Sequence, residues 1–239
     1  MVVSNSQFIT DLKVSKYYQR MFLKYDVIMI YLAGSNLAGV TDDRSDYDLI
    51  VITTDSPNLE SPNECLKYED IKVHWYYRNI ADFIKDYQNK SVLEIVGNVI
   101  FSNISEETIV YKNENYLKII DFLFDNKDEI SKLGALNIYT SLNNYVNSIL
   151  EGEEIKEQHY SKLLYHLCYA SYVLTQEEKD IEFLKSIKRI RWQPVSDDYK
   201  NKAVKRLKLS KEYVENIKID IEASIQEIKQ QLKIILEST

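Results

Sequence analysis

The chain has 239 residues and a net charge of −7 at pH 7, and 45% of its residues are hydrophobic. This length allows one large domain or two modest ones with a real apolar core, and the negative charge argues against a general nucleic-acid coat protein. No apolar run is long enough for a membrane span and the N-terminus lacks the pattern of a signal peptide, so we expect a cytoplasmic protein without membrane contacts. Cys65 and Cys168 are too few for a disulfide framework or a zinc site and are predicted to be free thiols.

Hydrophobic periodicity predicts a mixture of helices and strands in the first half of the chain. Residues 6–25 have the spacing of one amphipathic helix packed on a sheet, and residues 27–32 form a buried strand that ends at Gly34. A short helical turn through Leu37 and Val40 leads to a second strand at 47–52. The elements expected after it are a surface loop at 53–65, a strand at 71–77, helices at 79–87 and 91–100, and a small edge strand at 108–111.

The strand signal fades after about residue 113, and the rest of the chain has helical spacing. The predicted helices cover 115–126, 132–150, 158–174, 176–190 and 211–236. We therefore predict an α+β protein with two domains: an N-terminal α/β domain with a small mixed sheet at 1–112, and a C-terminal helical domain at 113–239.

The clearest candidate for a functional site lies between the first two predicted strands. Gly34 and Ser35 close the first apolar run, and Asp46 and Asp48 open the next. Side chains alternate along a strand, so the two aspartates should project from one face. Two carboxylates held this close repel each other unless a cation lies between them, and their oxygens suit Mg²⁺ or Mn²⁺. Glycine lets a backbone approach a phosphate, and serine adds a hydroxyl donor.

This spacing resembles the signature of the DNA polymerase β-like nucleotidyltransferase superfamily, and most closely its branch associated with RNA repair. That branch reads Gly-Ser-x-x-x-Gly before Asp-x-Asp, and Gly39 completes the pattern here. Weaker likeness at 83–95, 162–166 and 184–191 extends over most of the chain. The resemblance implies a two-metal Mg²⁺ or Mn²⁺ site held by Asp46 and Asp48, with Gly34 and Ser35 on the β- and γ-phosphates of an NTP such as ATP.

The third catalytic acid of the superfamily is where this sequence departs. The matching position is His74 on the polar face of the third strand, and histidine is a poorer ligand for Mg²⁺ than for Mn²⁺ or Zn²⁺. Asp70 could replace it only if the strand register is shifted, and Glu69 would point to the opposite face. Asn36 is a second departure, because the branch commonly has arginine there. The site therefore works with Asp46, Asp48 and His74, or its catalysis is weakened or lost.

In the helical half, the resemblance suggests two further nucleotide-binding residues, Lys162 and His166. They lie one helical turn apart, so they share a face and could reach a triphosphate, whereas the alternative is a solvated lysine and a packed histidine. Tyr169 stands where the branch tends to have arginine. Aromatic rows on these helices are more typical of a core than of base stacking.

The segment 185–211 carries ten basic residues against two aspartates, in an otherwise acidic chain. It is a candidate nucleic-acid surface, with a solvated helix face as the alternative. The leading hypothesis is a metal-dependent nucleotidyltransferase that moves an NMP from an NTP to an acceptor hydroxyl. An RNA 3′ end is the favoured acceptor, ahead of a protein hydroxyl or a small molecule. The alternatives are a degenerate, non-catalytic nucleotide-binding or regulatory module and a toxin–antitoxin component.

Overall fold

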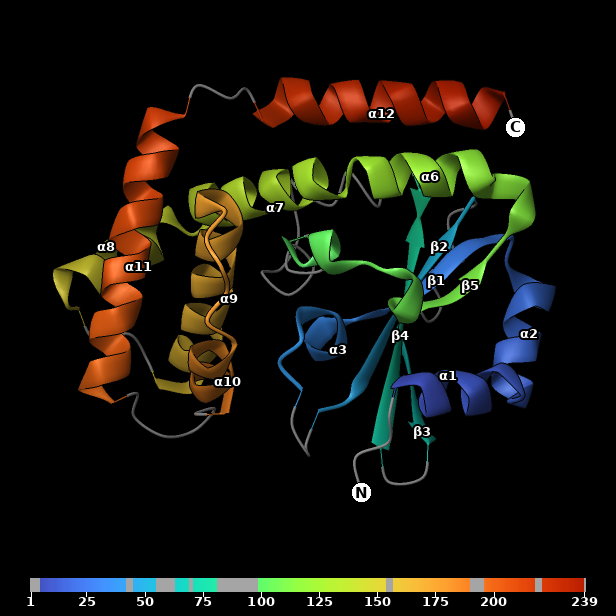
Figure 1. The fold of residues 1–239 in the computed structure, drawn as a ribbon, viewed down its shortest axis with the longest axis horizontal. Coiled ribbons are helices and arrows are strands. Elements are labelled where there is room, and N and C mark those ends of the chain that lie inside the picture. The colour runs from blue at the N-terminus through green and yellow to red at the C-terminus, as the bar shows by residue number, and fades with distance from the viewer. Residues whose placement is uncertain are drawn as a thin grey trace. The chain divides into compact units, whose positions relative to one another are not determined.

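The computed structural model describes residues 5–41, 45–54, 63–68, 71–80, 99–153, 157–189, 196–217 and 221–238. The chain folds into two compact units (Figure 1). The first unit comprises residues 1–86, 100–127 and 225–239, and the second comprises 87–99 and 128–224. Neither unit is one continuous segment, since the C-terminal residues group with the N-terminal half. The predicted boundary between residues 112 and 113 stays a prediction.

The first unit is built on a five-stranded mixed sheet with the order β3-β4-β2-β1-β5. Strands β2 and β4 run parallel, and the other neighbouring pairs run antiparallel. The strands are β1 (Val27–Ala33), β2 (Tyr47–Thr53), β3 (Asn63–Tyr68), β4 (Ile71–Asn79) and β5 (Ile109–Lys112). The predicted α+β class, the mixed sheet and the edge position of the strand near 108–111 are confirmed. β3 was missed, because its residues were assigned in part to the loop at 53–65.

Two short helices, α1 (Asn5–Lys13) and α2 (Lys16–Lys24), pack on one face of this sheet. Phe8 of α1 stacks on Tyr47 of β2 with 3.6 Å between the ring centroids, and Tyr17 of α2 contacts Trp75 of β4 at 5.3 Å. The prediction of one continuous helix at 6–25 was wrong. Ser15 interrupts it, because its side chain accepts a hydrogen bond from the Tyr18 amide and caps the second helix.

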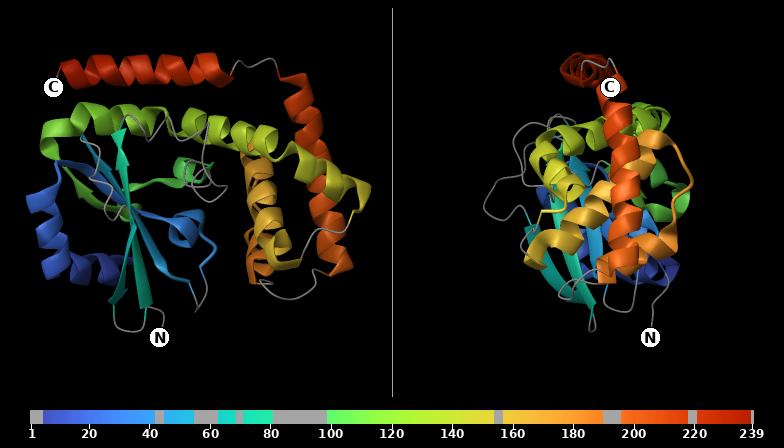
Figure 2. Two further views of the ribbon diagram at one scale, coloured as in Figure 1. Left: turned by 180° about the vertical axis from the view of Figure 1, so that it is seen from behind. Right: turned by 90° about the vertical axis from the view of Figure 1, so that its left-hand side faces the viewer.

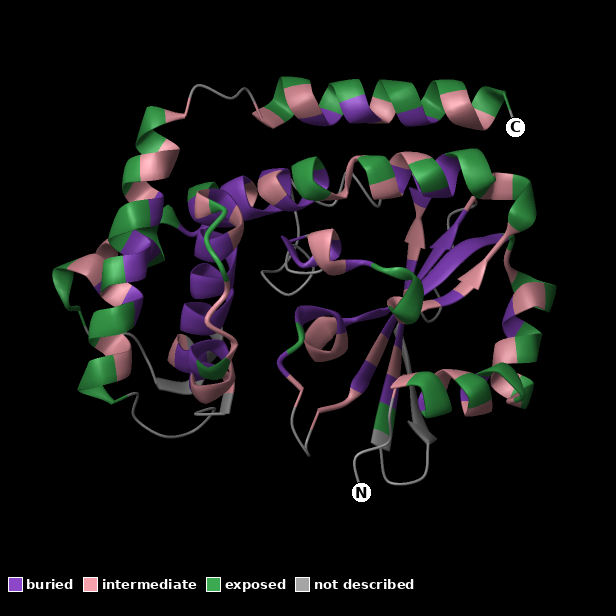
Figure 3. Cartoon of the chain, viewed as in Figure 1, coloured by how far each residue is buried: buried purple, intermediate pink, exposed green. Residues whose placement is uncertain are grey.

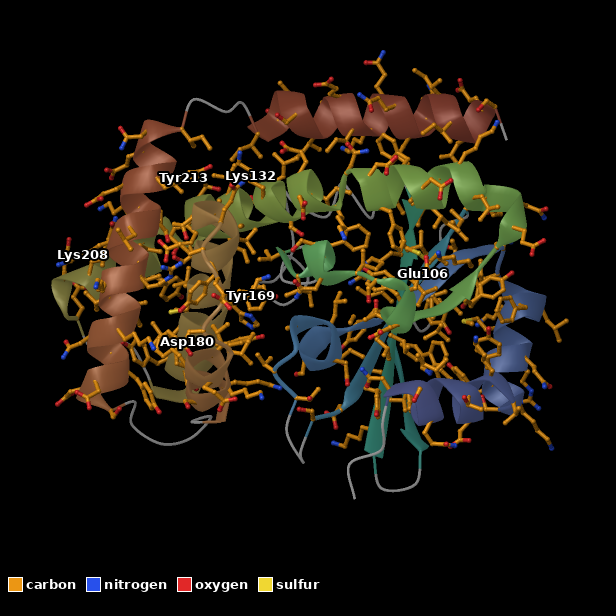
Figure 4. All side chains as sticks on the ribbon, viewed as in Figure 1. Glu106, Lys132, Tyr169, Asp180, Lys208 and Tyr213 are labelled. Carbon is orange, nitrogen blue, oxygen red and sulfur yellow. The ribbon has the colours of Figure 1, made fainter. Side chains whose placement is uncertain are left out.

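The first unit also contains short helical segments between and after the sheet strands, and two longer helices. They are α3 (Gly34–Ala38), η1 (Phe101–Asn103), η2 (Glu106–Thr108), η3 (Glu114–Tyr116), α6 (Leu117–Asp125) and most of α12 (Ile221–Glu237). Lys118 of α6 donates to the Ser238 carbonyl at 3.4 Å, so the end of the chain contacts α6. Glu106, which is labelled in Figure 4, pairs with Lys112 of the edge strand. Residues 81–98, where two further helices are predicted, lie outside the described residues.

Helices alone make up the described part of the second unit (Figure 2). They are α7 (Lys127–Ser141), α8 (Asn143–Glu151), α9 (Glu157–Thr175), α10 (Ile181–Arg189) and α11 (Asp197–Asn216). From Leu163 to Leu174 nearly every residue of α9 is buried, so α9 is the central helix of this unit (Figure 3). Its free Cys168 is fully buried, and burial raises the pKa of that thiol to about 12, which keeps it protonated and unreactive.

Two of the predicted helices in this half are each split in the structure. The segment 132–150 forms parts of α7 and α8, which meet at Leu142. The segment 211–236 joins the end of α11 to α12 across a break that begins at Ile217, and the first fourteen residues of α11 were not predicted to be helical. Their many lysines and arginines weaken the apolar periodicity on which the prediction relied.

Asp180 caps the N-terminus of α10 and ties it to α11. Its carboxylate accepts hydrogen bonds from Lys202 and from the Phe183 amide, the latter at 2.9 Å. The hydrogen bond from Lys202, followed by the one from the Phe183 amide, lowers the pKa of Asp180 below its usual value. Because the folded pKa lies below the unfolded one, this contribution to stability is present above about pH 4 and is lost as the pH falls through the folded pKa.

We therefore expect Asp180→Ala to lower the free energy of unfolding at pH 7 by about 1 kcal/mol, the usual effect of losing a helix cap. The difference from wild type should shrink as the pH falls below 4, since the carboxyl of the wild type is then being protonated. Urea unfolding followed by far-UV circular dichroism at pH 7 and pH 3 measures both values. A difference of the same size at the two pH values would show that the charge on Asp180 does not matter.

Candidate active site

The candidate site lies at the end of the first unit's sheet where β1 ends and β2 begins. β2 is the central strand, and its Asp48 is in register with Ala33 of β1 on one side and with His74 of β4 on the other. Tyr47 points to the opposite face, where it stacks on Phe8. The predicted alternation of side chains along this strand is thus confirmed, and the carboxylate of Asp48 faces away from the core formed with α1 and α2.

The backbone of Gly34 lies directly against the side chain of Asp48. Gly34 has φ +56°, a left-handed conformation that side-chain-bearing residues rarely adopt. A Cβ atom at this position would lie 2.9 Å from Cγ of Asp48 and closer still to Oδ2. The absence of a Cβ at Gly34 was predicted to make room for a phosphate. In the structure, the carboxylate of Asp48 occupies that space.

Asp46 lies on the same side of the sheet as Asp48, because it reaches His74. Its Oδ2 atom is 3.6 Å from Nε2 of His74, and the two side chains are 44% and 31% exposed. Both groups are accessible to a ligand in solution. Asn36 of α3 donates to the Asp46 carbonyl at 3.2 Å and so fixes the main chain just before β2. The side-chain amide of Asn36 therefore has a structural contact of its own.

Tyr76 is the residue of this site that the sequence did not single out. It follows His74 by two positions on β4, and the rings of the two residues lie 6.3 Å apart at 19°. Its hydroxyl donates to the carboxylate of Asp48. Burial, followed by the charge and the hydrogen bond of Asp48, raises the pKa of Tyr76 to about 12, and the charge of Asp46 adds to the same effect. Period-two alternation already placed Tyr76 on the face of His74, but only the strand register shows what it contacts.

The remaining predicted site residues lie in α3 and in α9. Ser35 follows Gly34 in the first turn of α3 and is half-buried. Lys162 and His166 belong to α9 of the second unit, and the side chain of Lys162 lies outside the described residues. His166 is 8% exposed and packs edge-on against the ring of Tyr165 at 5.0 Å. The side chains of Glu69 and Asp70 also lie outside the described residues. The nucleotide-binding roles of Ser35, Lys162 and His166 stay predictions.

Carboxylates neutralise much of the basic segment 185–211. Among the side chains of this segment that the structure describes, ion pairs join Lys185 to Glu182, Lys200 to Asp197, Lys202 to Asp180, Arg206 to Glu177, and Lys211 to Glu215. Arg206 is also largely buried. Lys205 and Lys208 are exposed on α11. Lys208 is labelled in Figure 4. The nucleic-acid contact predicted for this segment stays a prediction.

Comparisons with known proteins add little evidence about the function of this site. No family model matches the chain, and no curated protein matches its sequence. One similar solved structure is a nucleotidyltransferase-like protein from Exiguobacterium sibiricum, with 14% sequence identity and a TM-score of 0.35 over 87% of this chain and 74% of that one. We draw no conclusion from a similarity at this level.

Two further properties of the described residues bear on partners. No helix in the described part of the chain is long and apolar enough to span a membrane. Within the same residues, no three histidine, cysteine, aspartate or glutamate side chains are grouped so that they could hold a metal ion by themselves.

Proposed function

We propose that the protein is a metal-dependent nucleotidyltransferase that transfers an NMP from an NTP to an acceptor hydroxyl. The observation that carries the proposal is the placement of Asp46 and Asp48 on one face of the sheet, at the strand end where the side chain of Asp46 is exposed, beside the close approach of the Gly34 backbone. The sequence spacing of Gly34, Ser35, Asp46 and Asp48 resembles that of the polymerase β-like superfamily. This resemblance is the reason for assigning nucleotidyl transfer to the site.

The donor set suits a divalent cation that is shared with the nucleotide. Two carboxylates provide hard oxygen ligands for Mg²⁺ or Mn²⁺, and phosphate oxygens or water would complete the coordination. Such a cation would stabilise negative charge on the transferring phosphoryl group and the leaving pyrophosphate. The chain itself would hold Asp46 in place through Asn36, and it would hold Asp48 between Gly34 and Tyr76.

Loss of either carboxylate should abolish transfer while the fold is retained. We expect Asp46→Asn and Asp48→Asn to reduce transfer of label from α-labelled NTPs on the order of 10³-fold, because a catalytic metal provides several kcal/mol and each factor of ten corresponds to about 1.4 kcal/mol. The assay should supply Mg²⁺ or Mn²⁺, each of the four NTPs, and total RNA, protein or small hydroxyl compounds as acceptors. Thermal unfolding of each variant would verify the fold.

Asp121→Asn is a matched control for these substitutions, because Asp121 is an exposed aspartate on α6, an element without a residue in the candidate site. It should transfer label at the wild-type rate. Transfer that survives in both Asp46→Asn and Asp48→Asn would contradict the proposed site. Label found on RNA, and lost after treatment with ribonuclease, would identify the proposed acceptor.

One observation favours a second candidate, a non-catalytic nucleotide-binding module. His74 occupies the position of the third acid and contacts Asp46, so the described residues of the site provide two carboxylates where the superfamily has three. Such a site would bind an NTP with a cation but would not turn it over. Calorimetry that detects NTP binding, together with no transfer to any acceptor, would favour this module over the enzyme.

A further inference from the structure

Tyr76 is the strongest remaining candidate for a role, because it touches a proposed metal ligand from the protein side. In the parallel pairing of β2 with β4, Asp48 is in register with His74 and Ile50 is in register with Tyr76. Tyr76 therefore lies diagonal to Asp48 on the same face, within reach of a long side chain. The neighbouring Trp75 and Tyr77 are buried on the other face, so β4 presents only alternate residues to the site.

Two contacts restrict the carboxylate of Asp48. The backbone of Gly34 blocks one side of it, and the hydroxyl of Tyr76 donates a hydrogen bond to it. A phenol hydroxyl has an ordinary pKa near 10, so this donor is present throughout the neutral range. Hydrogen bonds that orient metal-binding side chains usually contribute about 10- to 100-fold to metal affinity or activity.

We propose that Tyr76 is a positioning residue, whose hydroxyl fixes the carboxylate of Asp48 in the orientation that binds the divalent cation. This inference rests on the proposed function, since it takes Asp48 to be a metal ligand. It adds a residue outside the Gly-Ser and Asp-x-Asp signature. The ring of His74 lies 6.3 Å from that of Tyr76 and is nearly parallel to it.

Tyr76→Phe tests the inference, because it removes the hydroxyl and keeps the ring. We expect the dissociation constant for Mn²⁺, measured by isothermal calorimetry on the full chain without nucleotide, to rise about tenfold. Tyr77→Phe is the matched control: it removes a hydroxyl from the same strand on the opposite face, where Tyr77 packs against Tyr25 at 4.8 Å. Its Mn²⁺ affinity should equal that of the wild type.

A second measurement needs no metal. Urea unfolding of Tyr76→Phe, Asp48→Asn and the double variant in the presence of EDTA should give non-additive changes in the unfolding midpoint, because the two side chains contact each other. Additive changes, or unaltered Mn²⁺ affinity in Tyr76→Phe, would overturn the inference. If the wild type itself binds no Mn²⁺, with or without NTP, the proposed function fails first, and the outcome is distinct from a failure of Tyr76 alone.

Discussion

Gly34→Ala should lower the free energy of unfolding by roughly 2–5 kcal/mol and abolish binding of Mn²⁺ and NTP. Two physical effects add at this position. A left-handed conformation costs a residue with a Cβ about 1–2 kcal/mol, and the new methyl group would overlap the carboxylate of Asp48, for which overpacking of about 1–3 kcal/mol is typical. Asp48 would have to move, so the site would be lost even in molecules that remain folded.

Gly39→Ala separates these two effects. Gly39 also has a positive φ, +70°, but a Cβ there would meet no atom within 4 Å. The variant should therefore lose only about 1 kcal/mol and should bind Mn²⁺ and NTP as the wild type does. Urea unfolding followed by circular dichroism, and calorimetric titration with Mn²⁺ and then NTP, give both quantities for both variants. Equal losses in the two variants would mean that the approach of Gly34 to Asp48 has no consequence.

Arg206→Ala should destabilise the second unit by roughly 2–4 kcal/mol. The guanidinium group pairs with Glu177, donates to Thr175 Oγ1 at 2.9 Å, and stacks on the ring of Tyr172 at 3.8 Å. Removing a buried partner of an ion pair usually costs about 3–5 kcal/mol. We place the expected value lower because Glu177 is 52% exposed and can be hydrated once the arginine is gone.

Lys205→Ala and Lys208→Ala are the controls for Arg206, because both lysines are exposed on the same helix. Each should change stability by no more than about 0.5 kcal/mol. Chemical denaturation of the three variants tests this order, and an Arg206→Ala variant as stable as the lysine variants would contradict it. A test of RNA contact on this helix should therefore use the exposed lysines, since Arg206→Ala would weaken any activity through unfolding.

The boundaries of the helices and strands show which local signals were sufficient. Strands β1 and β2 were predicted well, because a short, continuous apolar run that is bounded by polar or glycine residues is typical of a buried strand. The break at Ser15 was missed, although serine is a residue that often caps a helix. β3 was missed for another reason: it contains mixed polar residues, and its pairing with β4 is a tertiary interaction.

For the candidate site, the sequence by itself determined the residue types, their spacing and their side of the strand, because alternation with period two is a property of the backbone. Only the tertiary structure decided that Gly34 lies against Asp48 and that His74 reaches Asp46. The same holds for the hydrogen bond that Tyr76 donates to Asp48. Each of these contacts depends on the register between strands that are distant in the chain. Hydrophobic patterns select which face of a strand is buried, but the neighbour of each side chain follows from how the whole sheet pairs.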